Sequence, residues 1–309
     1  MSANHTTIKF GFAVPEDENA VQRLEDAGVT SLWTGGHLAA PMATPEALVG
    51  LTRLAAISRT ATVGTAVIVL PLYPPAIVAK QVAEIDQIAN GRTVLGVGVG
   101  GEFAGDYEAV QVPPSERGRR ANEAIPLLRR LWEGDAVDHD GRFYPMHGVR
   151  VNPPPVQSGG PPIIVAGRQP AAMRRAALLG EGWMPYMYTP RRYRESVSSI
   201  HELAAAGGVS LDGFGWYLWT SVCIRDDGAE ARRELADFLK RSTGQDFEPI
   251  ITKVALAGNP DEVSLRLAEF VDAGVRHFIF APIPNDGFRS IRRITGDVMP
   301  ALAAHTARR

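Results

Sequence analysis

The chain has little of several residue types and patterns, and each scarcity excludes a class of protein. Its only cysteine is Cys223, so it can form neither a disulfide framework nor a thiolate metal cluster. No apolar run approaches the roughly 20 residues of a membrane span, and residues 1–7 lack the features of a signal peptide. The formal net charge is -2, without the basic excess typical of nucleic-acid binding. We therefore expect a cytoplasmic protein with no nucleic-acid or membrane partner.

Lysine is also scarce, and none of the few lysines ends a predicted strand, where a Schiff base would form. The chain has no Gly-x-Ser-x-Gly elbow and no His, Asp or Glu set at metal-ligand spacing. His139 and His147 fall in a polar hairpin, so no metal is expected. These absences disfavour barrel hydrolases and aldolases. They favour a redox enzyme whose organic cofactor carries the chemistry, because such an enzyme needs few catalytic side chains.

Residues 61–132 are the most informative part of what is present. They contain two apolar strands, each followed by a turn and a helix, and the second strand ends in Gly98, Gly100 and Gly101, followed by Glu102. Glycines at the carboxyl end of a parallel strand let a backbone approach a flat or phosphorylated ligand. Parallel α/β folds bind ligands at this end, so the block predicts both the fold and the side of the active site.

Apolar runs and helical patterns alternate along the 309 residues. Most runs are continuous, as in strands covered on both faces. We predict one domain, residues 1–309, with the α/β fold of a (β/α)8 TIM barrel with insertions. Residues 134–162 read as a polar hairpin and loop, an excursion over the barrel. The predicted strands are Ile8–Val14, Ser31–Thr34, Thr62–Val69, Thr93–Val99, Ile163–Ala166, Gly182–Pro185, Gly215–Ile224 and His277–Ala281.

Caps and glycines delimit the predicted helices. Thr44-Pro45 and Asn259-Pro260 read as helix starts, and Gly28, Gly91, Gly180 and Gly274 as left-handed C-terminal caps. A doubly wound sheet is the competing fold, but the first strand is not followed by its Gly-x-Gly-x-x-Gly turn. The predicted helices are Glu16–Ala27, Pro45–Ser58, Pro75–Asn90, Ser115–Glu133, Pro170–Leu179, Pro190–Ala206, Ala229–Lys240, Pro260–Ala273 and a last one near Phe288–Ala301.

Few polar residues follow the carboxyl ends of the predicted strands. His37 comes just after the second strand, where an imidazole could exchange a proton with a bound substrate near neutral pH. A histidine bonded within its own loop is the alternative, and position alone favours it. Glu102 is either an acid, base or substrate ligand, or a solvated loop carboxylate. The other candidates are Thr34, Gly35, Gly36, Tyr186, Tyr188, Arg225, Asn285 and Asp286.

Gly167-Arg168-Gln169 joins the fifth strand to a helix. Backbone N–H groups at a helix start bind phosphate, and an arginine adds charge. An ordinary helix start is the alternative. Two groups of side chains could complete a binding site. Arginines could meet an acidic cofactor tail. Aromatic residues could line the mouth of the barrel, although each of them could equally lie in the core or at the rim. They are Arg174, Arg175, Arg191, Arg192 and Arg194, and Trp33, Tyr73, Phe103, Tyr186 and Tyr188.

These residues together resemble the luciferase-like monooxygenase superfamily, and within it the branch that uses the deazaflavin coenzyme F420. The resemblance covers nearly the whole chain and is strongest at Val63–Pro71, Gly91–Gly100 and Glu102-Phe103. It continues through Arg117-Gly118, Leu131-Trp132, Pro162–Gly167 and Gly258–Val263. It implies a TIM barrel, often a homodimer, with the cofactor ring in the barrel mouth.

The resemblance also implies roles for single residues. A bulge after the third strand, often with a non-prolyl cis peptide, would support the ring at Ala66-Val67. Gly98, Gly100 and Gly101 would admit the ring and its ribityl chain, and Ala166, Gly167 and Arg168 would meet the phosphate. His37 matches the family's active-site histidine. The family usually has an acidic residue just before it, where this chain has Gly36, so Glu102 or Glu16 would have to substitute.

The leading hypothesis is a coenzyme F420-dependent oxidoreductase that moves a hydride between the deazaflavin and a small organic substrate. His37 and Glu102 are its predicted catalytic residues, and Gly36 is counted with the cofactor-binding set. Two alternatives stay open. One is an FMN-dependent monooxygenase, in which reduced flavin captures oxygen. The other is a non-catalytic barrel that only binds a cofactor, which the glycine at position 36 motivates.

Overall fold

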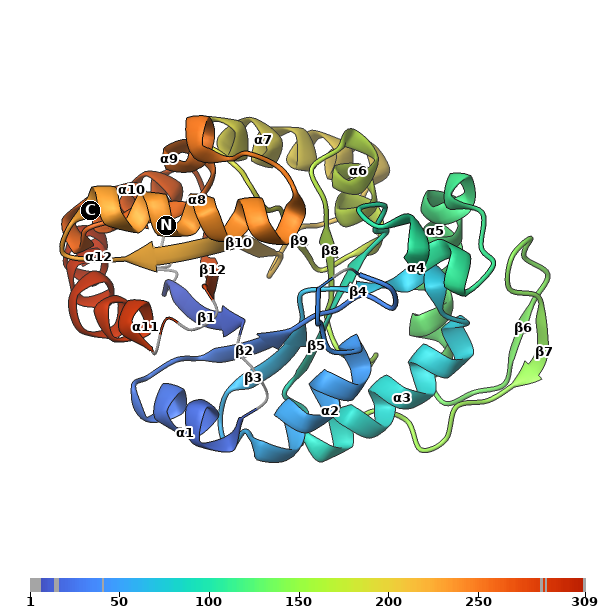
Figure 1. Cartoon of the computed structure of the whole chain (residues 1–309). Helices are drawn as coiled ribbons and strands as arrows, with labels where there is room; N and C mark the ends of the chain where they lie inside the picture. Colours follow the sequence, from blue (N-terminus) through green and yellow to red (C-terminus); the bar gives the residue numbers. More distant parts are fainter. Residues whose placement is uncertain (1–6, 14–16, 41, 284–285, 287, 308–309) are drawn as a thin grey trace.

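Eight parallel strands close a ring in this protein. The computed structural model describes residues 7–13, 17–40, 42–283, 286 and 288–307. The ring runs through β1, β2, β3, β5, β8, β9, β10 and β12 and returns to β1, with helices around it (Figure 1). Phe10 on the first strand pairs with Phe278 on the last, and Gly182 pairs with Gly215 to complete the circle. The predicted TIM barrel is confirmed.

The predicted strands agree closely with those of the ring. The predicted strand Thr62–Val69 is divided into β3 and β4 (Ile68–Val69), and β4 pairs with β5. A short strand that the sequence pattern does not predict, β11 (Leu256–Gly258), pairs with β10 outside the ring. The ring strands are β1 (Lys9–Ala13), β2 (Ser31–Thr34), β3 (Thr62–Thr65), β5 (Thr93–Gly98), β8 (Ile163–Ala166), β9 (Gly182–Met184), β10 (Gly215–Ile224) and β12 (His277–Pro282).

The helices also follow the prediction, with three differences. The sequence pattern predicts neither α4 (Ala104–Ala109), which lies between β5 and α5, nor the short α9 (Ile251–Val254). The last predicted helix is divided into α11 (Arg289–Arg293), a π-helical turn and α12 (Met299–Ala307). The others are α1 (Glu18–Asp26), α2 (Ala47–Ile57), α3 (Pro75–Ile88), α5 (Arg117–Trp132), α6 (Pro170–Leu179), α7 (Pro190–Gly207), α8 (Gly228–Thr243) and α10 (Pro260–Asp272). Among the described residues, no helix is long and apolar enough to cross a bilayer.

Several predicted caps are present and two are wrong. Asn259 caps α10 in a reciprocal capping box with Glu262, and Gly28 and Gly274 have the expected positive φ of 81° and 113°. Gly180, however, ends α6 at φ -116°, which is extended backbone that any residue adopts. At α2 the cap is the Glu46 carboxylate, which accepts from two backbone N–H groups, so the helix begins at Ala47 and not at Pro45.

Side chains fill the inside of the barrel. Trp33, Val94, Ile164, Met184 and Ile279 are buried there in one cluster. A larger core lies between the strands and the surrounding helices and contains residues such as Leu32, Val63 and Leu128. Because the interior is packed, a ligand of any size has to bind at an end of the barrel.

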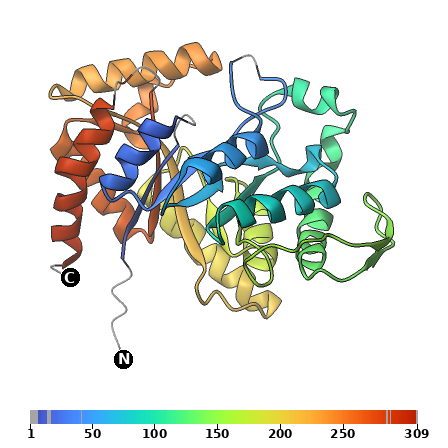
Figure 2. The same cartoon turned by 90° about the horizontal axis from the view of Figure 1, so that it is seen from below.

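Residues 134–162 form the predicted hairpin. Strands β6 (Val137–His139) and β7 (Met146–Val149) are antiparallel and project from the side of the molecule (Figures 1 and 2). Glu123 on α5 holds the hairpin loop, accepting hydrogen bonds from the backbone of Phe143 at 3.0 Å and Tyr144 at 2.9 Å. The excursion therefore lies against the outside of α5.

Candidate active site

A cavity of about 490 Å³ opens where β4, β5, β8 and β9 end. It brings together eight of the predicted site residues: His37, Val67, Gly98, Gly100, Glu102, Ala166, Gly167 and Arg168. Gly36, Ala66 and Gly101 are not among the lining residues. The other lining residues are Val69, Val99, Pro114, Ser115, Arg117, Gly118, Gln169, Ala171, Ala172, Arg175 and Tyr186.

The back of the cavity is the bulge between β3 and β4. The Ala66–Val67 peptide is cis, as the resemblance implied. Gly35 packs directly against this bond, since a Cβ at position 35 would lie 2.6 Å from the Ala66 carbonyl oxygen. The backbone N–H of Ala66 donates to the carbonyl of Thr34. Thr34 and Gly35, at the end of β2, therefore support the bulge.

Gly98 and Gly100 have to be glycines because the bulge packs closely against them, which the sequence does not reveal. A Cβ at Gly98 would lie 2.7 Å from Val67 Cγ2, and one at Gly100 would lie 2.8 Å from Val69 Cγ1. Gly100 also has φ 54°, which favours glycine. These glycines thus let the end of β5 pack against the bulge. The open cavity wall is a consequence of that close packing.

His37 is held by an aspartate that the sequence analysis does not single out. Its Nδ1 lies 2.7 Å from Oδ2 of Asp106 on α4. The other oxygen of Asp106 accepts from the backbone N–H groups of Leu38 at 2.8 Å and Ala39 at 2.9 Å. The Asp106 side chain is fully buried, whereas that of His37 is 24% exposed and lines the cavity. Phe103 packs edge-on against the imidazole, with ring centroids 4.7 Å apart.

The two substitutes expected for the missing acidic residue before His37 do not fill that place. Glu102 accepts a hydrogen bond from Tyr186, and Glu16 lies outside the described residues. A side chain at position 36 is sterically excluded, because its Cβ would lie 1.6 Å from the carbonyl oxygen of Pro45. The carboxylate that bonds His37 thus comes from Asp106 on α4, and the sequence gives only a weak signal for it. α4 is only six residues long and has no side-chain cap.

Glu102, Tyr186 and Arg168 form a chain across the cavity mouth. The Tyr186 hydroxyl donates to Glu102 Oε1 at 2.7 Å, and the Arg168 guanidinium stacks on the tyrosine ring at 4.5 Å from its centroid. Burial, and secondly the neighbouring Glu102 carboxylate, raise the pKa of Tyr186 to about 12. The hydroxyl therefore stays protonated at neutral pH and keeps donating to Glu102.

Three arginines line the cavity without an acidic partner. Within the described part of the chain, Arg117, Arg168 and Arg175 form no ion pair with a carboxylate, and Glu102 is the single acidic lining residue. Arg175 is only 6% exposed, and its hydrogen bonds go to neutral oxygens, Asn122 Oδ1 at 2.7 Å and Gly118 O at 3.1 Å. Burial lowers its pKa. A buried cation with neutral partners indicates an anionic ligand.

The start of α6 adds to this positive end of the cavity. Gln169 is the N-cap residue and makes no side-chain cap hydrogen bond, and Ala171 and Ala172 in the first turn line the cavity. Gly167, at φ 136°, lets the turn close, because a Cβ there would lie 2.7 Å from Cβ of Ala172. N–H groups at the start of a helix favour phosphate, although Pro170 has none here and that of Ala172 also donates to the Gln169 carbonyl at 2.9 Å. The donor set thus fits a ligand with a phosphorylated or acidic tail.

Other predicted candidates lie away from this cavity. Arg225 is buried in ion pairs with Glu234 and with Asp286, the latter at 2.8 Å, so it is a structural residue. Asn285 lies outside the described residues. Trp33 and Tyr188 are core residues, less than 2% exposed. Of the described His, Cys, Asp and Glu side chains, no group of three is placed to hold a metal ion.

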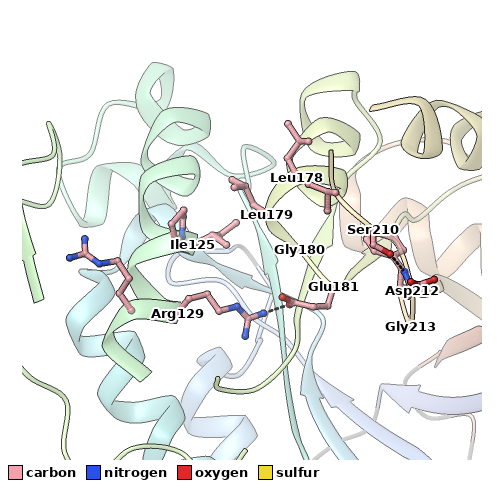
Figure 3. Close-up of a pocket in the computed structure, with 13 residues that line it drawn as sticks. Ile125, Arg129, Leu178, Leu179, Gly180, Glu181, Ser210, Asp212 and Gly213 are labelled. Atoms are coloured by element: carbon pink, nitrogen blue, oxygen red, sulfur yellow. Dashed lines mark hydrogen bonds and ion pairs between the residues drawn. The ribbon is translucent and has the colours of Figure 1, made fainter. Parts of the chain in front are cut away.

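A second cavity, of about 560 Å³, lies at the opposite end of the barrel, between α5 and the segment before β9 (Figure 3). Leu178, Leu179 and Ile125 form much of its wall. Its central charges are paired, since Arg129 and Glu181 point toward one another and form an ion pair.

A parallel barrel with a cavity that contains charged side chains at the strand carboxyl ends is the architecture of a barrel enzyme. The sequence profile of the luciferase-like monooxygenase family matches residues 3–277. The chain belongs to this family.

Among similar curated proteins is the F420-dependent glucose-6-phosphate dehydrogenase of Nocardia farcinica. It is 27% identical over 299 residues, which span 87% of this chain and 85% of the relative. The 5,10-methylenetetrahydromethanopterin reductase of Archaeoglobus fulgidus is 25% identical, over 96% of this chain and all of the relative. Among solved structures, an F420-dependent secondary alcohol dehydrogenase in complex with an F420-acetone adduct superposes with a TM-score of 0.85. The two chains are 19% identical, and the superposition covers 96% of this chain and 99% of the other.

Proposed function

We propose that this chain is a coenzyme F420-dependent oxidoreductase that transfers a hydride between the deazaflavin and a small organic substrate. The family membership and the F420-dependent glucose-6-phosphate dehydrogenase among the relatives support this function. The observation that carries it in the structure is the pairing, in one cavity, of a carboxylate-bonded imidazole with three arginines that have no acidic partner among the described residues.

The cavity fits the cofactor in two respects. Arg175, Arg168 and the start of α6 would hold the phosphate and acidic tail, because the arginines supply positive charge, that of Arg175 buried, at the first turn of the helix. The cis bulge at Ala66-Val67 and the glycines Gly98, Gly100 and Gly101 would hold the ring. Gly36, Ala166 and Gly167 complete the proposed binding set. When bound, the deazaflavin supplies the hydride donor or acceptor.

The protein's own part is the movement of one proton. His37 lies at the cavity wall and is the proposed proton donor or acceptor for the substrate. Glu102 faces the same cavity, with its position fixed by Tyr186, and is the proposed second acid or base or a substrate ligand. This assignment requires few catalytic groups, because the cofactor carries the electrons.

The proposed assembly is a homodimer built on α2 and α3. Val49 on α2 is 61% exposed and Ile77 on α3 is 52% exposed, and the two helices lie side by side. Exposed apolar side chains on adjacent helices are typical of an interface. Sedimentation velocity at micromolar concentration should give a mass of two chains, and Ile77→Asp should reduce it to one. A monomeric wild type would rule the dimer out. The single-domain organisation and the cytoplasmic location stay predictions.

A side-by-side titration of apo protein with coenzyme F420 and with FMN tests the cofactor. We expect saturable binding of the deazaflavin at micromolar concentration and far weaker binding of FMN. Turnover of a substrate panel containing glucose 6-phosphate and 2-propanol should proceed without oxygen consumption. Tight binding of FMN alone, with oxygen uptake, would establish the flavin monooxygenase instead. Tight binding of F420 with no turnover on a broad panel would favour the non-catalytic barrel.

A further inference from the structure

The carboxylate of Asp106 has three hydrogen-bond donors around it and no solvent. Oδ1 accepts from the N–H groups of Leu38 and Ala39, and Oδ2 lies 2.7 Å from His37 Nδ1. The side chain is fully buried. Oδ1 already accepts two N–H bonds, and an aspartate carboxylate can only accept hydrogen bonds. His37 Nδ1 must then be the donor.

We propose that Asp106 is the positioning residue of His37, and that it fixes the imidazole as the Nδ1–H tautomer. The lone pair of a neutral ring is then on Nε2, which becomes the atom that exchanges a proton with the substrate. The inference rests on the proposed function of His37. It adds which nitrogen reacts and which residue decides this.

The proton and electron balance of the step is simple. In substrate oxidation the hydride, with two electrons, leaves a substrate C–H bond for the cofactor. The substrate O–H bond breaks as its proton forms a bond with Nε2, and its electron pair closes the new carbonyl. The resulting imidazolium faces the Asp106 carboxylate through Nδ1–H, so the positive charge has a buried partner. Substrate reduction reverses each change.

Two further contacts hold His37, one to its ring and one to its backbone. Phe103 packs edge-on against the imidazole, and the backbone N–H of His37 donates to Thr44 Oγ1 at 3.3 Å. Thr44 is available for this bond because Glu46 caps α2 in its place. With Gly36 closed to any side chain, Asp106 from α4 is the carboxylate that the described structure brings to the ring. The short helix α4 thus serves the site and is more than a connection.

The test is Asp106→Asn, studied first without cofactor or substrate. The amide oxygen can still accept from the two backbone N–H groups, and the amide nitrogen can donate to Nδ1. We therefore expect the ring to change to the Nε2–H tautomer. The chemical shifts of the His37 ring nitrogens in ¹⁵N-labelled protein report this directly. His37 keeping a protonated Nδ1 in the variant would overturn the proposal, whatever the activity.

Turnover gives the second readout. Asp106→Asn should lower kcat by about 10²- to 10⁴-fold, because the nitrogen facing the substrate then carries a proton. The F420 affinity and KM should stay within about threefold. In a His37→Ala background the same change should lower kcat by less than about threefold. An equal loss in both backgrounds would show a structural role for Asp106 and overturn the proposal. If His37→Ala leaves turnover unchanged, the proposed function of His37 fails, while the tautomer measurement still decides the role of Asp106.

Discussion

Each end of the barrel has a histidine, and the two histidines differ in their exposure and in their hydrogen-bond partners. At the carboxyl ends of the strands, His37 is partly exposed and bonded to a buried carboxylate. At the amino ends, His277 opens β12, is 8% exposed and bonds to the Ser31 hydroxyl at 2.7 Å. Ser31 Oγ also accepts a hydrogen bond from Trp33 Nε1 at 2.8 Å. Burial, and secondly the charge of Lys9, lower the pKa of His277 to about 3.

The arginines at the two ends also differ in whether they have an acidic partner. Arg129 at the amino end is paired with Glu181, whereas Arg175 at the carboxyl end has neutral partners. One end satisfies its polar groups internally and adds to stability. The other end leaves charge and proton-exchange capacity for a ligand. The same strands therefore end in two environments, and substitutions at the two ends should separate effects on activity from effects on stability.

The largest expected effect is on turnover, from His37→Ala. Removing the imidazole should lower kcat by about 10²- to 10⁴-fold, because proton transfer loses its positioned group. The affinity for F420, followed by quenching of cofactor fluorescence, should change by less than about threefold. Unchanged kcat would remove His37 from the mechanism.

The next effect is on stability in acid, from His277. An unfolded chain protonates this imidazole near its ordinary pKa of 6.5, whereas the folded chain does so only near 3. Stability is therefore unaffected above pH 6.5 and falls as the pH drops through the window from 6.5 to 3. This single group should remove about 2 kcal/mol of the free energy of unfolding between pH 7 and pH 5.

Urea unfolding at both pH values measures this effect. His277→Gln should flatten the loss between pH 7 and pH 5, although the variant starts from a lower stability. His147→Gln, in the exposed hairpin, is the matched control and should keep the wild-type slope. Parallel slopes for His277→Gln and the wild type would contradict the assignment.

A third effect is on cofactor affinity, from Arg175→Gln. Loss of a charge-assisted contact should weaken F420 binding by about 10- to 100-fold. Binding of the deazaflavin ribityl compound that lacks the phosphate and acidic tail should hardly change. Arg174→Gln is the matched control, because Arg174 is exposed on the same helix. Equal losses for both deazaflavins would show that Arg175 supports the cavity wall and does not bind the tail.

The smallest effect should come from Glu181→Gln at the amino end. The Arg129–Glu181 pair is half exposed on its acidic side, so breaking it should cost at most about 1 kcal/mol of unfolding free energy. F420 affinity and kcat should equal the wild-type values. A loss of cofactor affinity in this variant would show that the two ends are coupled.

The sequence by itself determined the architecture and the side of the site. Continuous apolar runs alternating with capped helices predicted the eight ring strands, because strands buried on both faces carry a strong local pattern. His37, Glu102, Gly98, Gly100 and Arg168 followed from the rule that ligands bind at strand carboxyl ends, and all five line one cavity. Their roles rest on the family resemblance and stay predictions.

Only the tertiary structure decided which groups meet. Asp106 and His37 are 69 residues apart, and a short helix without a capping side chain gives no sequence signal that a carboxylate is aimed at the ring. Likewise, the glycine at position 36 reads as a missing acid, whereas the fold excludes a side chain there. Local periodicity reports burial along one element. Which residues of different elements come into contact depends on the packing of the closed barrel, and no short stretch of sequence determines that packing.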